Sequence, residues 1–328
     1  MRKIFSLAAV TLLVAATVSG CSSNEAGPLD SPLVCKHFVT GSAADQISGK
    51  VPAKGVPTLD FKKGLSTTST QSKEIVEGKG PRFGGNQQVR FDYEMYDAAT
   101  GKNLQGNSWD GSDSVTQVLS APAKGDTSAD FCSALSGARE GSTVAVIFSA
   151  KDSHKSKAIP SAGIGANDSI IFVFKLNKVY LPHAIGTAKP AQDGFPQIVT
   201  DSKGVPGLVM QDWSTSAAPK EFKSEVLIEG KGQVLKENDY VTVHYSGFIW
   251  SPAKTQFDSS WTKGNPATFQ LKQGNLIPGF IKALVGQRVG SQVVAVIPPS
   301  DGYGNQASGS IPANSTLIFV IDILAEGQ

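Results

Sequence analysis

The sequence has few of the residues that carry covalent or metal chemistry. Its 328 residues include four histidines and three cysteines. The histidines lie far apart without the spacing of metal ligands, and neither a His-Glu-x-x-His nor a Gly-x-Ser-x-Gly motif occurs. We therefore expect no metal, no cofactor and no covalent catalysis.

An excess of charge of one sign is also lacking. The chain has 30 basic and 28 acidic residues, and removal of residues 1–20, which contain Arg2 and Lys3, leaves 28 of each. Without a basic run or patch, nucleic acid and anionic lipid surfaces are excluded as electrostatic partners. The 34 glycines and 18 prolines favour a turn-rich, mostly β protein, and its length suffices for two domains.

The first twenty residues have the features of a secretory signal. A basic start precedes an apolar run from Ile4 to Val18, which is too short for a helix that spans a bilayer. The run ends at Ser19-Gly20-Cys21, which resembles the bacterial lipoprotein signal. The resemblance implies a signal peptide over 1–20, acylation of Cys21, a tether over 21–33 and anchoring at the extracytoplasmic face of the membrane. An ordinary signal peptide with an incidental cysteine is the alternative.

Two cysteines remain once Cys21 is acylated. Cys35 and Cys132 form an even number in a compartment that is oxidising. They are a disulfide candidate that would close a loop of about one hundred residues, with a stabilisation on the order of 4 kcal/mol in the chain-entropy model. The alternative is two buried, unpaired thiols.

An internal repeat divides the chain. Four blocks recur in the same order at offsets between 152 and 147 residues: 76–80 as 228–232, 89–93 as 241–245, 131–142 as 280–291, and 164–167 as 311–314. Ordered recurrence of this kind indicates two copies of one fold. The sequence predicts domains over 34–181 and 195–328, the latter with a core over 224–328. Residues 182–194, rich in Ala, Pro and Gly, are the predicted linker.

Periodicity in the second copy predicts an α+β fold. Residues 240–247 alternate between apolar and polar side chains, as in a half-buried strand, and 293–297 and 317–324 are rich in β-branched residues. Residues 279–286 place Phe280, Ala283 and Leu284 on one face of a short helix. We expect each domain to be a curved antiparallel β-sheet wrapped around one short α-helix.

Four short motifs in the second copy place apolar residues at turns and strand ends. They are 257–260 (FDSS), 277–280 (IPGF), 298–304 (PPSDGYG) and 311–319 (IPANSTLIF). In combination they resemble the FKBP family of prolyl isomerases, over residues from about 226 to 324. The resemblance implies peptidyl-prolyl cis-trans isomerase activity, clients that are unfolded or proline-containing polypeptides of the cell envelope, and binding of macrolide inhibitors.

The resemblance also implies an aromatic pocket. Tyr245, Phe257 and Phe319 would form its walls and Phe280 its floor, and Phe269 would contact the substrate. From composition alone, aromatic side chains in a small β-rich domain serve the core, and this remains the alternative for Phe269 and Phe319.

The rest of the implied site is its entrance and its polar groups. Leu276 and Ile277 would line the entrance, with the backbone N–H of Ile277 as a donor to the substrate. Tyr303 would direct its hydroxyl at a substrate carbonyl, and Asp258 would be the one carboxylate beside the pocket. Ile311 would close the far side.

The second copy departs from the family pattern at three positions. Phe280 stands where the best-known members have Trp, Ala267 stands where many have Phe, and Trp261 stands where a charged residue is frequent. These differences put the affinity for macrolides in doubt more than isomerisation, since a pocket that strips water from the X-Pro amide needs no nucleophile.

The first copy departs further. Tyr93, Phe131 and Phe172 align with Tyr245, Phe280 and Phe319, but the position opposite Phe257 reads Gln105. Residues 152–154 (DSH) stand in place of Gly-Tyr-Gly, and Thr127-Ser128 in place of Leu276-Ile277. We expect this copy to be catalytically silent. A binding module or chaperone, in which both copies hold unfolded or proline-rich segments and the pocket serves recognition more than turnover, is the competing hypothesis for the whole protein.

Overall fold

The protein is described by a computed structural model that covers residues 30–37, 40–124, 129–209, 217–251 and 255–327. The predicted signal peptide, the lipidation site Cys21 and the pair Thr127-Ser128 lie outside these residues. Within the described parts of the chain, no helix is long and apolar enough to cross a membrane.

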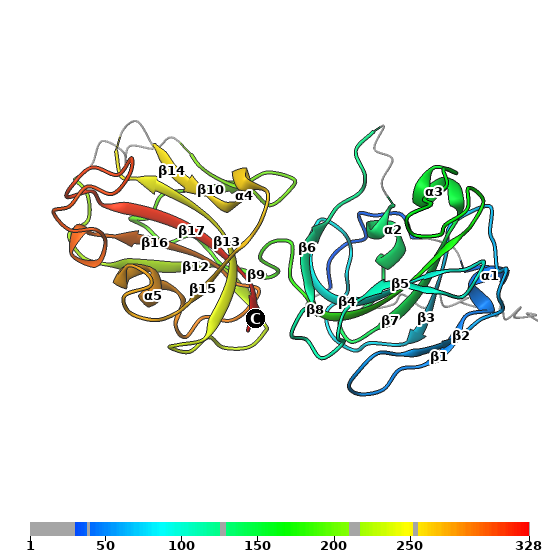
Figure 1. Ribbon diagram of the computed structural model, residues 1–328. Helices are drawn as coiled ribbons and strands as arrows, with labels where there is room; N and C mark the ends of the chain where they lie inside the picture. The colour runs from blue at the N-terminus through cyan, green and yellow to red at the C-terminus, as the bar shows by residue number, and fades with distance from the viewer. Residues whose placement is uncertain (1–29, 38–39, 125–128, 210–216, 252–254, 328) are drawn as a thin grey trace, which may run out of the picture.

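The N-terminal domain contains one large antiparallel sheet (Figure 1). Its strands follow the order β3-β7-β8-β4-β5, and β6 pairs with β4. The elements are β3 (Gln71–Val76), β4 (Gln87–Asp97), β5 (Asn103–Gly106), β6 (Val115–Leu119), α2 (Phe131–Leu135), β7 (Thr143–Phe148), α3 (Ala150–His154) and β8 (Ile170–Val179). The short elements α1 (Ser42–Asp45), β1 (Ser48–Lys50) and β2 (Thr58–Asp60) precede them.

The C-terminal domain has the same topology. Its sheet follows the order β9-β12-β16-β17-β13-β14, with β15 paired to β13. The elements are β9 (Gly186–Ala188), β10 (Ile198–Thr200), β11 (Pro206–Leu208), β12 (Lys223–Gly230), β13 (Tyr240–Ile249), β14 (Gln256–Ser259), α4 (Ser260–Lys263), β15 (Ala267–Gln270), α5 (Pro278–Leu284), β16 (Gln292–Ile297), η2 (Pro299–Asp301) and β17 (Leu317–Glu326).

The two sheets share their irregularities as well as their strand order. A register shift occurs between Glu74 and Val76 on β3 and between Val226 and Ile228 on β12, 152 residues later. Shifts on β4 and on β13 are likewise offset by 152 residues. Because a β-bulge is a local deviation that sequence must specify, the shared bulges show that the two copies have one fold. The predicted α+β fold class is confirmed.

Each sheet is covered on both faces. In the C-terminal domain, α5 packs through Phe280, Ala283 and Leu284 against one face, and Gly286 follows the helix with φ +87°, as a left-handed cap requires. The hairpin β10–β11 covers the apolar centre of the other face through Ile198 and Leu208. We call the α5 side the front and the hairpin side the back.

The predicted linker is not a free connection. The N–H of Tyr180 donates to Gln88 O, so this residue still belongs to the N-terminal sheet. The N–H of the next residue, Leu181, donates to Leu324 O in the C-terminal domain. Residues 186–188 then form the edge strand β9 on β12. The prediction of a linker over 182–194 was therefore wrong. The open edge of β12 offers unpaired N–H and C=O groups, and a segment of almost any sequence can pair with them through its own backbone.

The predicted tether is also too long. Ser31 is buried, and the Asp30 carboxylate forms an ion pair with Arg139 at 2.6 Å. Cys35 lies next, joined by a disulfide to Cys132 on α2. Residues 30–33 therefore belong to the N-terminal domain and not to the tether.

Candidate functional site

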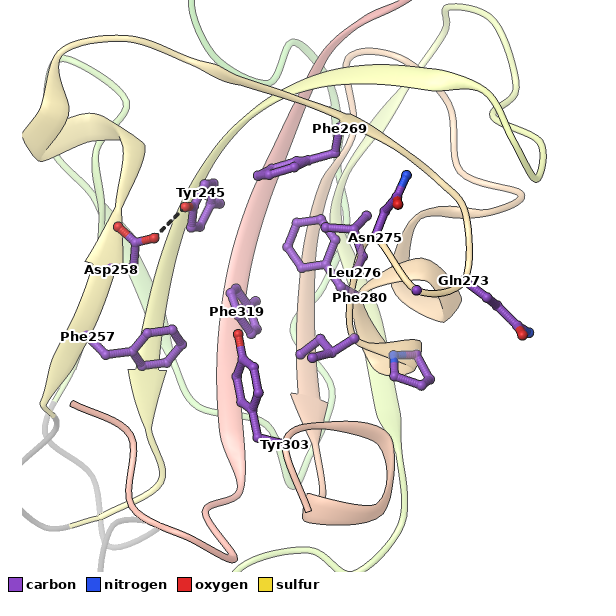
Figure 2. A pocket seen from close by; sticks show the side chains of 13 residues that line it. Tyr245, Phe257, Asp258, Phe269, Gln273, Asn275, Leu276, Phe280, Tyr303 and Phe319 are labelled. Carbon is purple, nitrogen blue, oxygen red and sulfur yellow. Dashed lines mark hydrogen bonds between the residues drawn. The ribbon is translucent and has the colours of Figure 1, made fainter. Parts of the chain in front are cut away.

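The front of the C-terminal sheet holds a pocket of about 750 Å³. It opens between α5, the strand β14 and the loop that carries Tyr303 (Figure 2). Thirteen residues line it: Tyr245, Phe257, Asp258, Phe269, Gln273, Gly274, Asn275, Leu276, Ile277, Pro278, Phe280, Tyr303 and Phe319. Nine of these are residues that the sequence analysis assigned to the site, and the structure brings them together from six separate segments of the chain.

The floor and the walls are aromatic rings that pack edge to face. Phe280 lies with its ring 5.2 Å from that of Phe319 at 84°, and 5.7 Å from that of Phe269 at 75°. Phe257 approaches Phe319 at 5.5 Å and 81°. Edge-to-face packing directs the positive edge of one ring at the negative face of the next, and this fixes the orientation of all four rings.

Alternation along strands places these rings on one face. Tyr245 and Gly247 on β13 both face the front, and Phe319 on β17 lies opposite Gly247. A Cβ atom at Gly247 would lie 2.5 Å from Cζ of Phe257. The glycine therefore makes room for the Phe257 ring beside Phe319.

One polar pair belongs to the pocket. The Tyr245 hydroxyl donates to Oδ2 of Asp258 at 2.6 Å, as Figure 2 shows. Lys263 approaches Oδ1 of the same carboxylate at 2.6 Å. Burial, followed by the Asp258 carboxylate, raises the pKa of Tyr245. Burial alone would raise the pKa of Asp258, but hydrogen bonds from Lys263 and Tyr245 outweigh it and lower the pKa, so the carboxylate is ionised at neutral pH.

The residues at the pocket entrance are more exposed than those of its floor. Tyr303 is 39% exposed and extends its hydroxyl into the pocket beside Phe319 (Figure 2). Ile277 is the residue that precedes α5, in extended backbone conformation, and Pro278 begins the helix. Proline at this position has no N–H to leave unpaired. The helix start therefore sets Leu276 and Ile277 at the rim.

The structure corrects one predicted site residue and adds four. Ile311 is not among the residues that line the pocket, and its side chain is 5% exposed within the core cluster. Gln273, Gly274, Asn275 and Pro278 line the rim and were missed. The first three follow β15 in a polar loop whose sequence has no pattern that points to a pocket, whereas Pro278 lies within a motif that was recognised.

The N-terminal copy keeps the rings and loses the polar groups. Tyr93 and Phe172 lie 6.5 Å apart, against 6.2 Å for Tyr245 and Phe319. The strand register corrects one alignment between the two copies. On β5, Leu104 is the counterpart of Phe257, and Gln105 is the counterpart of Asp258.

The loop that follows β7 differs as well. Counting from the ends of β7 and β16 places His154 at the position of Tyr303. Both ring nitrogens of His154 contact backbone carbonyls, of Lys157 at 2.7 Å and of Asp168 at 2.8 Å. This side chain is held within its own loop.

Comparison with known proteins agrees with this site. The sequence model described as FKBP-type peptidyl-prolyl cis-trans isomerase matches residues 231–324. FK506-binding protein 1 of Aspergillus oryzae is 36% identical over 108 residues, which are 30% of this chain and 93% of the relative. The chain belongs to the FKBP-type peptidyl-prolyl cis-trans isomerase family, and its C-terminal domain is the family's enzyme domain.

Bacterial relatives match about one hundred residues of the chain. FkpA of Escherichia coli is 37% identical over 100 residues, 30% of this chain and 36% of the relative. A probable FKBP-type isomerase of Haemophilus influenzae is 45% identical over 96 residues, 29% and 38% respectively. The crystal structure of Escherichia coli FkpA aligns over 40% of this chain and 51% of that chain, with 32% identity and a TM-score of 0.30. The chain thus spans about a third of the length of these two bacterial relatives.

Proposed function

We propose that the protein is a peptidyl-prolyl isomerase that is anchored by a lipid on Cys21 to the outer face of a bacterial membrane. There it would assist the folding of exported polypeptides. The observation that carries the catalytic part is the single pocket that joins four edge-packed rings to the Tyr245–Asp258 pair. The N-terminal signal and the Cys35–Cys132 disulfide support an oxidising compartment outside the cytoplasm.

The mechanism follows from the resistance of the X-Pro bond to rotation. Amide resonance makes the barrier about 18 to 20 kcal/mol, and resonance is lost in the twisted state. The rings of Phe280, Phe257 and Phe319 would hold the prolyl ring and exclude water, which disfavours the charge-separated resonance form. The enzyme needs only to bind the twisted amide more tightly than the planar one.

The polar groups would act on the twisted amide. The Ile277 N–H and the Tyr303 hydroxyl are donors for carbonyl oxygens that flank the proline. Asp258 holds the Tyr245 hydroxyl and adds a fixed negative charge at the wall. Such preorganised dipoles stabilise a transition state without reorganisation.

The N-terminal domain would bind clients without turnover. Its rings Tyr93, Phe131 and Phe172 are half-buried, so they present apolar surface. Gln105 and His154 stand in place of Asp258 and Tyr303, which removes the groups that act on the amide. The domain therefore fits a docking role beside the enzyme domain.

An exchange assay tests the catalytic proposal. The chain from residue 22 onward, without lipid, is assayed for proline isomerisation in tetrapeptides by NMR exchange, with and without rapamycin. We expect acceleration that rapamycin inhibits, and its loss in the double variant Asp258→Ala, Tyr303→Phe, while the matched double variant Gln105→Ala, His154→Phe retains it. A folded chain without acceleration would leave client binding as the function.

A separate experiment tests the anchor. Cells that express the full chain are labelled with a clickable palmitate analogue, and the Cys21→Ala variant is the control. Label on the protein that the variant lacks, together with membrane fractionation, is the expected result. Secretion of an unlabelled protein would refute the anchor and leave the isomerase proposal unchanged.

A further inference from the structure

The helical turn α4 lies across the edge of β13 and touches both faces of the sheet. Neighbouring residues of a strand point to opposite faces, so Tyr245 faces the pocket and His244 faces the back. From α4, Lys263 reaches Asp258 at the pocket. Trp261 of the same turn lies on the back, against His244. The turn therefore connects a pocket residue with the reverse side of the sheet.

The contact on the back is a face-to-face stack. The rings of His244 and Trp261 lie 3.9 Å apart with 18° between their planes. Burial, with a smaller contribution from His183, lowers the pKa of His244 to about 4. The imidazole is therefore neutral at neutral pH, and the indole stacks on an uncharged ring. The buried indole N–H has no hydrogen-bond partner within the described chain, so the stacking face is what Trp261 contributes.

Ser260 ties the same turn to the strand between these two residues. Its hydroxyl oxygen accepts the backbone N–H of Tyr245 at 2.8 Å and lies 2.9 Å from Nδ1 of His244. Ser259 caps α4 by accepting the Trp261 N–H at 3.2 Å. With these bonds in place, the position of Trp261 influences the position of Asp258, which is the residue before the cap Ser259.

We propose that Trp261 is a positioning residue: its stack on His244 from the back of the sheet holds Asp258 where it accepts the Tyr245 hydroxyl at the front. The inference rests on the proposed catalytic use of the Tyr245–Asp258 pair. It goes beyond that use because it assigns a role to a side chain that does not line the pocket. A charged residue at this position would have no comparable ring to stack.

A double-mutant cycle in the chain from residue 22 onward tests the proposal. Trp261→Ala should lower kcat/KM by about tenfold, because a misplaced catalytic group loses rate without loss of the fold. Asp258→Asn should lower it by a similar factor. Since Trp261 acts through Asp258, the double variant should be no slower than the single ones. Effects that multiply to about one hundredfold would overturn the proposal.

Two further variants separate positioning from general stability. Trp261→Phe retains a stacking ring and should keep kcat/KM within twofold of the unsubstituted chain. Trp261→Leu supplies apolar bulk without a ring and should behave as Trp261→Ala, which keeps the test decisive if the alanine variant does not fold. Full activity in Trp261→Leu would refute the proposal.

Trp250→Ala is the matched control. Trp250 packs against the apolar cluster on the same back face, and it does not line the pocket. Its loss should lower the melting temperature and leave kcat/KM of the folded chain unchanged. If the unsubstituted chain shows no isomerisation at all, the catalytic proposal fails; if it is active and Trp261→Ala matches it, only the positioning role fails.

Discussion

Asp322, which is buried, and His244, which is half-buried, lie on the back of the C-terminal sheet and should titrate with opposite effects on stability. Asp322 is 1% exposed, and its carboxylate accepts Ala184 N–H and the Gln292 side-chain amide, each at 2.8 Å. Burial raises its pKa to about 6, against 3.8 as the ordinary value, although both hydrogen bonds oppose the shift. His244, on the neighbouring strand, has a pKa lowered to about 4 from 6.5.

The sign of each contribution follows from the direction of its shift. The raised pKa of Asp322 means that its neutral form favours the fold below pH 4, and that this contribution is lost as pH rises through 6. The lowered pKa of His244 means that its contribution is present above pH 6.5 and is lost as pH falls toward 4. Each shift is a little over two pKa units, which corresponds to on the order of 3 kcal/mol.

The two effects therefore nearly cancel in the unsubstituted protein between pH 4 and 6.5. Asp322→Asn removes the acid and keeps an acceptor for Ala184, so this variant should lose on the order of 3 kcal/mol more stability than the parent over that range as pH falls. His244→Phe keeps a ring for the stack and removes the base. It should gain stability relative to the parent as pH falls, by a similar amount.

Urea unfolding at half-unit pH intervals measures both slopes, with the fluorescence of Trp250 and Trp261 as the signal for this domain. Titration of all other groups is common to the three proteins, so the comparison is between the slopes of parent and variant. Curves for Asp322→Asn that run parallel to the parent would refute the assigned burial of the charge. Parallel curves for His244→Phe would do the same for the imidazole.

Three further predictions concern single sites. Gly247→Ala should displace the Phe257 ring and lower kcat/KM by about tenfold in the exchange assay, while Gly207→Ala, with no atom closer than 3.9 Å to its added Cβ, should change nothing. Cys132→Ser should destabilise the N-terminal domain in calorimetry by on the order of 4 kcal/mol, because the disulfide spans 97 residues, and should leave isomerisation intact. Glu225→Gln should stabilise the chain at pH 7 by about 1 kcal/mol in urea unfolding, since burial raises the pKa of this acid and therefore disfavours its charged form.

The pocket could be predicted from the sequence because its residues occur in compact motifs. Phe257 and Asp258 are adjacent, as are Leu276 and Ile277, so recognition of a motif fixes several lining residues together. Ile311 lies in such a motif also, yet its side chain turns into the core. A motif fixes the backbone path, whereas the packing of neighbouring side chains decides which residue of the path faces the cavity.

Contacts that depend on a difference in turn length between the two copies could not be predicted. Counting at the repeat offset of 152 residues pairs Phe257 with Gln105, but the turn before β14 is one residue longer than the turn before β5, and Leu104 is the true counterpart. A shift of one residue moves every side chain of a strand to the other face. For the same reason, the hydrogen bond between Tyr245 and Asp258 is a result of the register and not of either residue alone.

The edge strand β9 shows a different limit. Gly186, Thr187 and Ala188 are all exposed and have little preference for a strand. Their conformation comes from the open edge of β12, with which they pair over three residues. Because Ala184 also donates to the buried Asp322, a fragment of the enzyme domain should begin no later than Leu181. A cut at residue 190 would expose this edge and leave the buried acid with the Gln292 amide but without its backbone donor Ala184.

The comparison of the two domains separates what the fold needs from what the chemistry needs. Phe280 and Phe319 are each about 5% exposed, so these rings are core residues as well as pocket residues. Their counterparts Phe131 and Phe172 remain in the N-terminal domain at the same ring spacing of 5.2 Å. The Asp258 side chain is 33% exposed, so the hydrophobic core does not depend on this residue. A copy released from catalysis can therefore lose its carboxylate at little cost in stability, whereas loss of a ring would leave a cavity that costs about 3 to 5 kcal/mol.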